Sequence, residues 1–149
     1  MSWFQQETKK SISAIDKQIL DSLLMTSNEA VIFYDSQFTI NVFNKASEAL
    51  FNLKSEEIIG HNFTLEKARQ LPSQILANVM FPSLAPTVVR QSPEGVYPQI
   101  IDLILEEPHK ELRVFLNKVV DENNEILGFV KIIHDQTRER GLLQSQKDF

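Results

Sequence analysis

The sequence predicts an α+β domain with a five-stranded antiparallel sheet and helices on one face of it. Two observations predict this class. Residues 30–42 hold two short apolar segments on either side of a polar turn, and residues 97–134 hold three more, again separated by polar turns. Between these regions, apolar side chains recur at three- and four-residue steps, which is the period of helices.

The first two segments are predicted to form a hairpin. Residues 30–34 are an apolar run, residues 35–37 are a polar turn, and residues 38–42 alternate between apolar and polar side chains. Asn44 is a good N-cap for a helix that follows directly. Gly60 ends the next helical turn, because glycine adopts the left-handed conformation most easily.

The middle of the chain is predicted to be helical. Pro72 suits the first turn of a helix that Pro82 ends, and the apolar face of this helix is made by Ile75, Leu76, Val79 and Met80. Ser83 can cap a further helix in which Leu84 and Val88 face inward. Three strands are then predicted within residues 97–134.

Residues 8–25 contain neither Gly nor Pro and carry Ile and Leu at helical spacing. This helix can pack on the sheet of its own domain, or it can form a parallel contact with a second copy of the chain. We favour the second copy because the helix precedes the domain. The seam is short, since Ser22 falls on it. The expected dimerisation residues are Ile12, Ile15, Ile19 and Leu23.

The order of these features resembles a PAS domain, and the resemblance covers residues 28–135. It is carried by Asp35, Phe43-Asn44-Lys45-Ala46, Leu50-Phe51 and Ile58-Ile59-Gly60-His61. The resemblance implies three parts. Residues 1–27 would be a signalling and dimerisation helix, residues 28–135 the PAS domain, and residues 136–149 the start of a linker helix.

The end of the last predicted strand carries Asp135-Gln136-Thr137. Asp135 or Thr137 can cap the helix that follows. The run also resembles the Asp-X-Thr element that ends many PAS sensor domains, which implies a role in signal relay. Residues 138–149 resemble the run that leads into the phosphoaccepting helix of bacterial sensor histidine kinases. The kinase signature itself is absent, so we expect a fragment of a longer, two-component kinase.

Composition narrows the function classes. The 15 basic and 20 acidic residues give a net charge of −5, which disfavours nucleic acid as a partner. The apolar runs are too short to cross a bilayer, and no signal peptide is recognisable. We therefore expect a cytoplasmic piece without membrane contact. The resemblance to a sensor histidine kinase implies a parent protein that is anchored in the inner membrane.

The chain offers little for catalysis or for cofactors. His61, His109 and His134 are not at metal-ligand spacing, and no catalytic residues are identified, so neither an enzyme nor a metal site is expected. The chain has no cysteine. Within PAS domains, this excludes a flavin of the cysteinyl-adduct type. Haem is disfavoured because residues 72–90 contain no histidine.

A small apolar ligand could still bind between the sheet and the helices, as the resemblance implies. The expected lining residues are Phe81, Leu84, Val88, Phe115 and Ile132, and Arg90 or Arg113 would contact an acidic ligand. The competing interpretation is that these apolar residues fill one another's gaps as ordinary core.

The sequence leaves two main hypotheses. The first is a sensory PAS domain of a histidine kinase, which dimerises and relays a signal through its flanking helices to a kinase domain and a response regulator. The second is a ligand-free module that binds a regulatory protein partner. A third hypothesis is an enzyme, which is disfavoured because no set of catalytic residues was identified.

Overall fold

The computed structural model describes residues 28–71, 74–85, 87–106 and 108–137, and the predicted helix of residues 8–25 lies outside them. Along the described chain the elements are β1 (Ala30–Asp35), β2 (Ile40–Phe43), α2 (Lys45–Phe51), α3 (Ser55–Ile58), α4 (Leu65–Arg69), α5 (Ile75–Met80), a 3₁₀ turn η1 (Pro82–Leu84), β3 (Thr87–Gln91), β4 (Gln99–Glu106), β5 (His109–Val120) and β6 (Ile126–Asp135).

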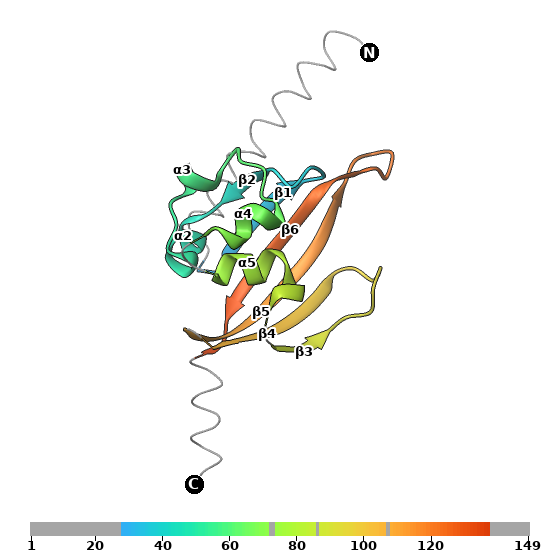
Figure 1. Cartoon of the computed structure of the whole chain (residues 1–149). Coiled ribbons are helices and arrows are strands. Elements are labelled where there is room, and N and C mark those ends of the chain that lie inside the picture. The colour runs from blue at the N-terminus through green and yellow to red at the C-terminus, as the bar shows by residue number, and fades with distance from the viewer. Residues whose placement is uncertain (1–27, 72–73, 86, 107, 138–149) are drawn as a thin grey trace.

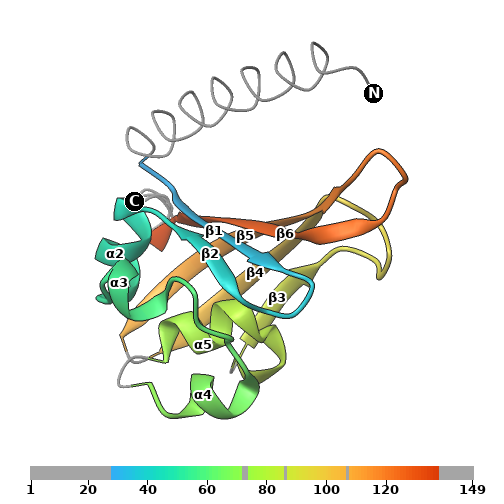
Figure 2. The ribbon, with the colours of Figure 1, turned by 90° about the horizontal axis from the view of Figure 1, so that it is seen from above.

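The strands form one antiparallel sheet in the order β2-β1-β6-β5-β4-β3. Helices α2 to α5 lie on one face of this sheet (Figures 1 and 2). We call this face the inner face and the opposite one the outer face. The first and last described strands, β1 and β6, pair at its centre. The predicted α+β class is therefore confirmed.

The described sheet has six strands, one more than predicted, because residues 87–91 form β3 rather than a helix. The prediction of a helix begun by Ser83 was wrong. Only a 3₁₀ turn forms there, and Thr87, Val88 and Val89 are β-branched residues that favour a strand. Since β3 pairs only with β4, it is an edge strand, and all five of its residues are exposed.

The predicted hairpin and N-cap are confirmed. The Asn44 carboxamide oxygen accepts hydrogen bonds from the Ser47 backbone N–H at 3.0 Å and from the Val31 N–H at 3.0 Å. Its amide nitrogen donates to the Glu29 carbonyl at 2.9 Å. One buried side chain thus caps α2 and ties that helix to the start of β1. Gly60 has the predicted positive φ of 84°.

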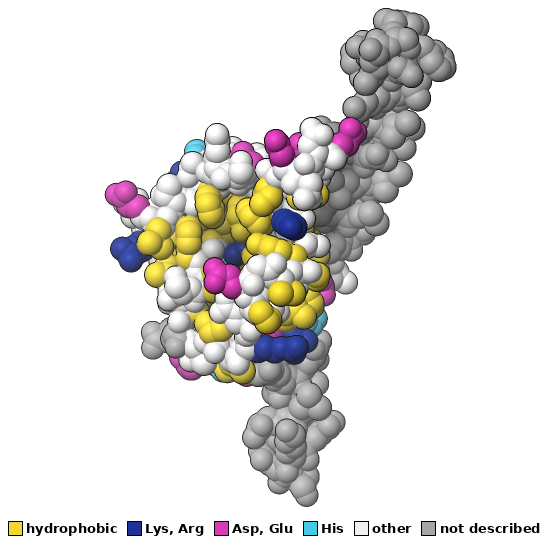
Figure 3. Space-filling view, turned by 90° about the vertical axis from the view of Figure 1, so that its right-hand side faces the viewer, with side chains coloured by type: hydrophobic (Ala, Val, Ile, Leu, Met, Phe, Trp, Pro, Cys, Tyr) yellow, Lys and Arg dark blue, Asp and Glu magenta, His cyan; other side chains and the backbone are white. Residues whose placement is uncertain are grey.

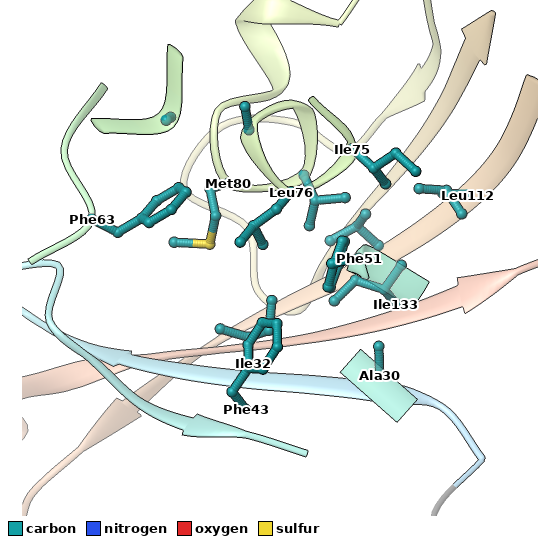
Figure 4. Close-up of a cluster of buried hydrophobic side chains, with 14 of the residues drawn as sticks. Ala30, Ile32, Phe43, Phe51, Phe63, Ile75, Leu76, Met80, Leu112 and Ile133 are labelled. Carbon is teal, nitrogen blue, oxygen red and sulfur yellow. The ribbon is translucent and has the colours of Figure 1, made fainter. Parts of the chain in front are cut away.

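The hydrophobic core lies between α5 and the inner face of the sheet. In Figure 4, Leu76 and Met80 of α5 point toward the sheet, where Ile32 and Ile133 lie. Five of the six α5 residues are buried, the exception being Asn78. Because each fully buried aliphatic side chain contributes about 1.5–3 kcal/mol, α5 is held chiefly by this apolar contact.

Gly128 in β6 provides a test of the β1–β6 register. A Cβ atom at this position would lie 2.3 Å from the Tyr34 carbonyl oxygen and 2.9 Å from the Asp35 Cα. Gly128→Ala should lower the free energy of unfolding by about 1–3 kcal/mol or more, because backbone atoms must move. Chemical denaturation measures the change.

Gly95→Ala is the matched control, since nothing lies within 4 Å of a Cβ there and only its positive φ of 82° is unfavourable. It should cost about 1–2 kcal/mol. A Gly128→Ala variant as stable as the wild type would contradict the register.

Candidate functional site

The chain leaves the sheet through a compact polar network. The Asp135 carboxylate accepts hydrogen bonds from the Thr137 hydroxyl at 2.6 Å and the Thr137 N–H at 3.0 Å, and it pairs with Lys110 at 3.2 Å. The Thr137 hydroxyl in turn accepts from the Glu111 N–H at 2.8 Å. We call this the exit network. It fixes the first residues after β6 to the start of β5.

The electrostatics of Asp135 follow from this network. Burial alone would raise the pKa of its carboxyl group, but the hydrogen bonds from Thr137 and the charge of Lys110 outweigh it and lower the pKa. Asp135 is therefore ionised at neutral pH. The stability that it contributes is present above its unfolded pKa and is lost only as the pH falls through the lowered folded pKa.

The inner face contains a buried basic residue, Lys131 of β6, which is 2% exposed. It lies opposite Ile32 of β1 and Leu116 of β5 in the sheet. Its ammonium donates to the carbonyl oxygens of Val79 at 2.8 Å and Met80 at 3.2 Å. These are among the last carbonyls of α5, which find no partner within the helix itself. Lys131 therefore joins β6 to the end of α5.

Lys131 also contacts an aromatic ring of β1. Its Nζ atom lies 5.9 Å from the centre of the Tyr34 ring, which gives a cation–π contact. None of the described ion pairs gives Lys131 a carboxylate partner. Burial consequently lowers the pKa of Lys131 to about 7, since a dry environment disfavours the charged form.

An aromatic series leads from Tyr34 to the surface. The Tyr34 ring stacks on Phe38 with 5.4 Å between centroids, Phe38 lies 6.3 Å from Phe81, and Phe81 lies 6.2 Å from Phe63. The last three rings line a pocket of about 200 Å³, together with Asn62, Thr64 and Leu65. We call it the aromatic pocket.

The predicted pocket residues are only partly brought together. Phe81 lines the aromatic pocket, and Leu84 packs against the core. Val88 lies opposite Leu103, but on the edge strand, where it is 39% exposed. Phe115 and Ile132 lie opposite one another in β5 and β6, and both alternate with buried residues, so their side chains are on the outer face. Placing those two in an inner pocket was wrong, because alternation along a strand gives two faces without showing which one the helices cover.

The predicted anion contacts are also on the outer side of the sheet. Arg113 makes two hydrogen bonds to Asp102, at 2.8 and 3.0 Å, and these raise the pKa of the guanidinium. Arg90 lies opposite the same aspartate and is exposed. Neither arginine therefore reaches the inner face.

A continuous apolar row crosses the outer face. It runs over four neighbouring strands, β1, β6, β5 and β4, in the order Val31, Ile132, Phe115 and Ile100, which lie directly opposite one another. A polar row lies beside it, with Asp102 and Arg113 followed by His134, which contacts Glu29 at 3.2 Å. Such a stripe is suited to packing against another element.

The predicted dimerisation residues lie outside the described part of the chain; they are Ile12, Ile15, Ile19 and Leu23. Within the part of the chain that the structure describes, no group of three His, Asp or Glu side chains is placed to hold a metal ion. No described helix is long and apolar enough to cross a membrane.

The architecture can be compared with known proteins. No protein-family model matches the sequence, and no curated protein matches it. Among solved structures, the PAS domain of Bordetella pertussis BvgS is similar over 93% of this chain and 99% of that one, with a TM-score of 0.60 and 17% identity. The chain has the PAS fold.

Two further structures support the same fold. A PAS domain from Colwellia psychrerythraea aligns with 83% of this chain and 98% of its own, with a TM-score of 0.50 and 19% identity. An RNA-binding light-oxygen-voltage receptor aligns with 91% of this chain but only 38% of its own, with a TM-score of 0.52 and 14% identity. At such identities the similarity shows the PAS fold and not a shared ligand.

Lys131 is the site residue that sequence reasoning missed. The signal was present, because Lys131 stands in the apolar run Phe129-Val130-Lys131-Ile132-Ile133 of a predicted central strand. Because side chains alternate between the two faces of a strand, Lys131 shares a face with Phe129 and Ile133. Which of the two faces the helices would cover, however, depends on the register with β1 and β5.

The buried amine predicts an unusual dependence of stability on pH. The folded pKa of Lys131, about 7, lies below the unfolded value, so the unfolded state binds more protons above neutral pH. Stability should rise by roughly 3 kcal/mol between pH ~7 and ~9.5. Burial and the neighbouring Tyr97 raise the pKa of Tyr34, and that effect acts only at still higher pH.

Chemical denaturation across this pH range measures the slope. Lys131→Met should remove the rise, while Lys118→Met, at an exposed position of β5, should retain it. The slope is the readout because Lys131→Met also deprives two α5 carbonyls of their donor. Equal slopes for both variants would contradict the burial of Lys131.

Proposed function

We propose that this chain is the sensory and signal-relaying PAS domain of a two-component histidine kinase. The observation that carries the proposal is the exit network, in which Asp135 and Thr137 fasten the outgoing chain to β5. A shift of β5 or β6 must then move the outgoing segment, because the hydrogen bonds join them directly. The likeness of residues 138–149 to the run that precedes a phosphoaccepting helix supports the kinase context.

A sensory role also needs an inner region that responds to a ligand or to a change in packing. Here β6 carries both Lys131, which contacts the end of α5, and Asp135, which belongs to the exit network. The two residues are four apart on one strand. A displacement of α5 against the sheet would therefore be passed along β6 to the exit.

Dimerisation is part of the proposal. The outer apolar row of Val31, Ile132, Phe115 and Ile100 supports it, because a four-strand apolar stripe is stabilised when it is covered. Residues 8–25 supply a second apolar stripe, through Ile12, Ile15, Ile19 and Leu23. We propose a homodimer that is built on these two surfaces. The parent protein would be anchored in the inner membrane, and the domain would use neither haem nor a cysteinyl flavin.

The alternative is a ligand-free module that binds a regulatory protein, and the same outer row favours it. The two functions differ in which substitutions matter. An interaction module would lose its partner on changes to the outer row and would tolerate changes in the exit network, whereas a relay domain would lose regulation on changes to the exit network.

Asp135→Ala tests the relay. Loss of its capping interactions should cost about 0.5–2 kcal/mol and leave the fold intact, yet change the response of kinase autophosphorylation in the full-length protein. Asp121→Ala is the matched control, because the Asp121 carboxylate also accepts two hydrogen bonds, from the backbone N–H groups of Asn123 and Glu125 at 2.8 and 2.9 Å, but in the β5–β6 turn.

A similar loss of stability in both variants, with altered kinase regulation only in Asp135→Ala, would support the relay. Unchanged regulation in Asp135→Ala would remove the proposed role of the exit network.

The dimer can be tested on the whole chain by sedimentation equilibrium. The wild type should be a dimer at micromolar concentration, and Ile15→Asp should raise its dissociation constant at least tenfold, because the charge falls in the apolar seam. Ser13→Asp, off the seam, should behave as the wild type does. A monomeric wild type, or equal dissociation constants for the two variants, would rule out this contact.

A further inference from the structure

The turn between β1 and β2 has a phenylalanine where its geometry favours glycine. Residues 36–38 form this turn, which is closed by hydrogen bonds from the Phe38 N–H to the Asp35 carbonyl and from the Asp35 N–H to the Thr39 carbonyl, both at 3.0 Å. The last residue of such a three-residue turn adopts the left-handed conformation and is usually glycine. Here it is Phe38, with a φ of 63°. A bulky residue is strained in this conformation, and strain of this kind is found mostly at functional sites.

The strained turn presents the Phe38 ring to the aromatic pocket. Phe38 and Leu65 are 41% and 38% exposed and form the rim of the pocket, whereas Phe63 is only 2% exposed and forms its floor. The pocket is therefore open to solvent at one end and reaches the core at the other. Hydrophobic side chains are also gathered on the surface of the side where β3 and the β5–β6 hairpin lie (Figure 3), so exposure alone does not mark a ligand site.

The shape of the pocket suits a flat ring. The Phe81 ring lies 19° from parallel to Phe38 and 11° from parallel to Phe63, so that nearly parallel ring faces border the pocket. Offset stacking on such faces favours an aromatic ligand. The volume is about 200 Å³. Because an apolar cavity of about 150 Å³ is enough to hold benzene, the pocket can hold one ring or two fused rings.

The lining also disfavours a charged ligand. None of the six described residues that line the pocket carries a charge. The two polar ones have partners outside it, since the Asn62 amide donates to the Gln37 carbonyl at 2.8 Å and the Thr64 hydroxyl accepts from the Lys67 N–H at 3.2 Å. A charge that enters the pocket would lose water without gaining a partner, which is costly.

We infer that the aromatic pocket binds a small neutral aromatic molecule of one ring or two fused rings, which stacks on Phe38, Phe63 and Phe81. This inference rests on the proposed sensory function and specifies its ligand class. The pocket adjoins the contact between α5 and β6, because Phe81 directly follows Met80, whose carbonyl accepts a hydrogen bond from Lys131. A ligand that displaces the Phe81 ring would therefore act next to this contact.

Binding of phenol to the whole chain tests the inference, with cyclohexanol and benzoate as matched probes. Cyclohexanol keeps the hydroxyl group and the size of phenol but is not aromatic, and benzoate keeps the aromatic ring but adds a charge. An NMR titration of the protein at neutral pH gives the three dissociation constants. We expect phenol to bind at millimolar concentration or below and about tenfold more tightly than cyclohexanol, because ring stacking adds to apolar burial. Benzoate should bind more weakly than phenol, because its charge finds no partner.

Substitutions of Phe38 separate a ligand site from ordinary packing. Phe38→Ala removes the ring, and Phe38→Gly removes the ring and also relieves the positive φ, so the glycine variant should be the more stable of the two. Both variants should weaken phenol binding about tenfold or more. Leu127→Ala is the control, because it shortens a 51% exposed apolar side chain outside the pocket and should leave phenol binding unchanged.

Four outcomes would overturn the inference: no binding of phenol at millimolar concentration, equal affinity for phenol and cyclohexanol, tighter binding of benzoate than of phenol, or unchanged phenol binding in Phe38→Gly. The comparison of probes uses the wild type and decides the question even if a variant fails to fold. Failure here is distinguishable from failure of the relay. A chain that binds no phenol, while Asp135→Ala still alters kinase regulation, leaves the relay intact and refutes the ligand class.

Discussion

The contact between β6 and the end of α5 is the constraint on which the inner face of the sheet depends. Apolar burial alone would let α5 slide along the sheet, since such contacts are not directional. The ammonium of Lys131 adds two directed hydrogen bonds to the last turn of the helix. The position of α5 is therefore tied to one residue of β6, the charged form of which the interior disfavours.

This arrangement connects two ends of the domain through a single strand. Lys131 contacts α5, and four residues later Asp135 anchors the outgoing chain to Thr137 and Lys110. β6 also lies at the centre of the sheet, between β1 and β5. In the proposed relay, a displacement of α5 would be passed along β6 to the exit network.

The features that the sequence predicted well are local ones. The hairpin of residues 30–42, the Asn44 cap and the left-handed Gly60 depend on the chemistry of a few neighbouring residues. The pairing of Asp135 with Thr137 is also a local feature, because the two are only two residues apart on the chain. The order of these features along the chain then carried the PAS resemblance.

The features that were missed depend on partners far away in the chain. Residues 87–91 form a strand that pairs with β4. The prediction gave more weight to Pro82 and Ser83, as signals of helix boundaries, than to the strand preference of residues 87–91. Phe115 and Ile132 were assigned to the wrong face because alternation gives two faces but not which one the helices cover. Lys131 was overlooked for the same reason. Its burial is set by α5, whose Met80 and Val79 carbonyls lie 51 and 52 residues earlier in the chain.

The most direct test is to observe the ionisation of Lys131 itself. In a pH titration of ¹⁵N-lysine-labelled protein followed by NMR, the account predicts one side-chain amine that titrates near pH 7 and is missing from Lys131→Met. If no side-chain amine titrated near pH 7, the burial of Lys131 and its tie to α5 would be contradicted.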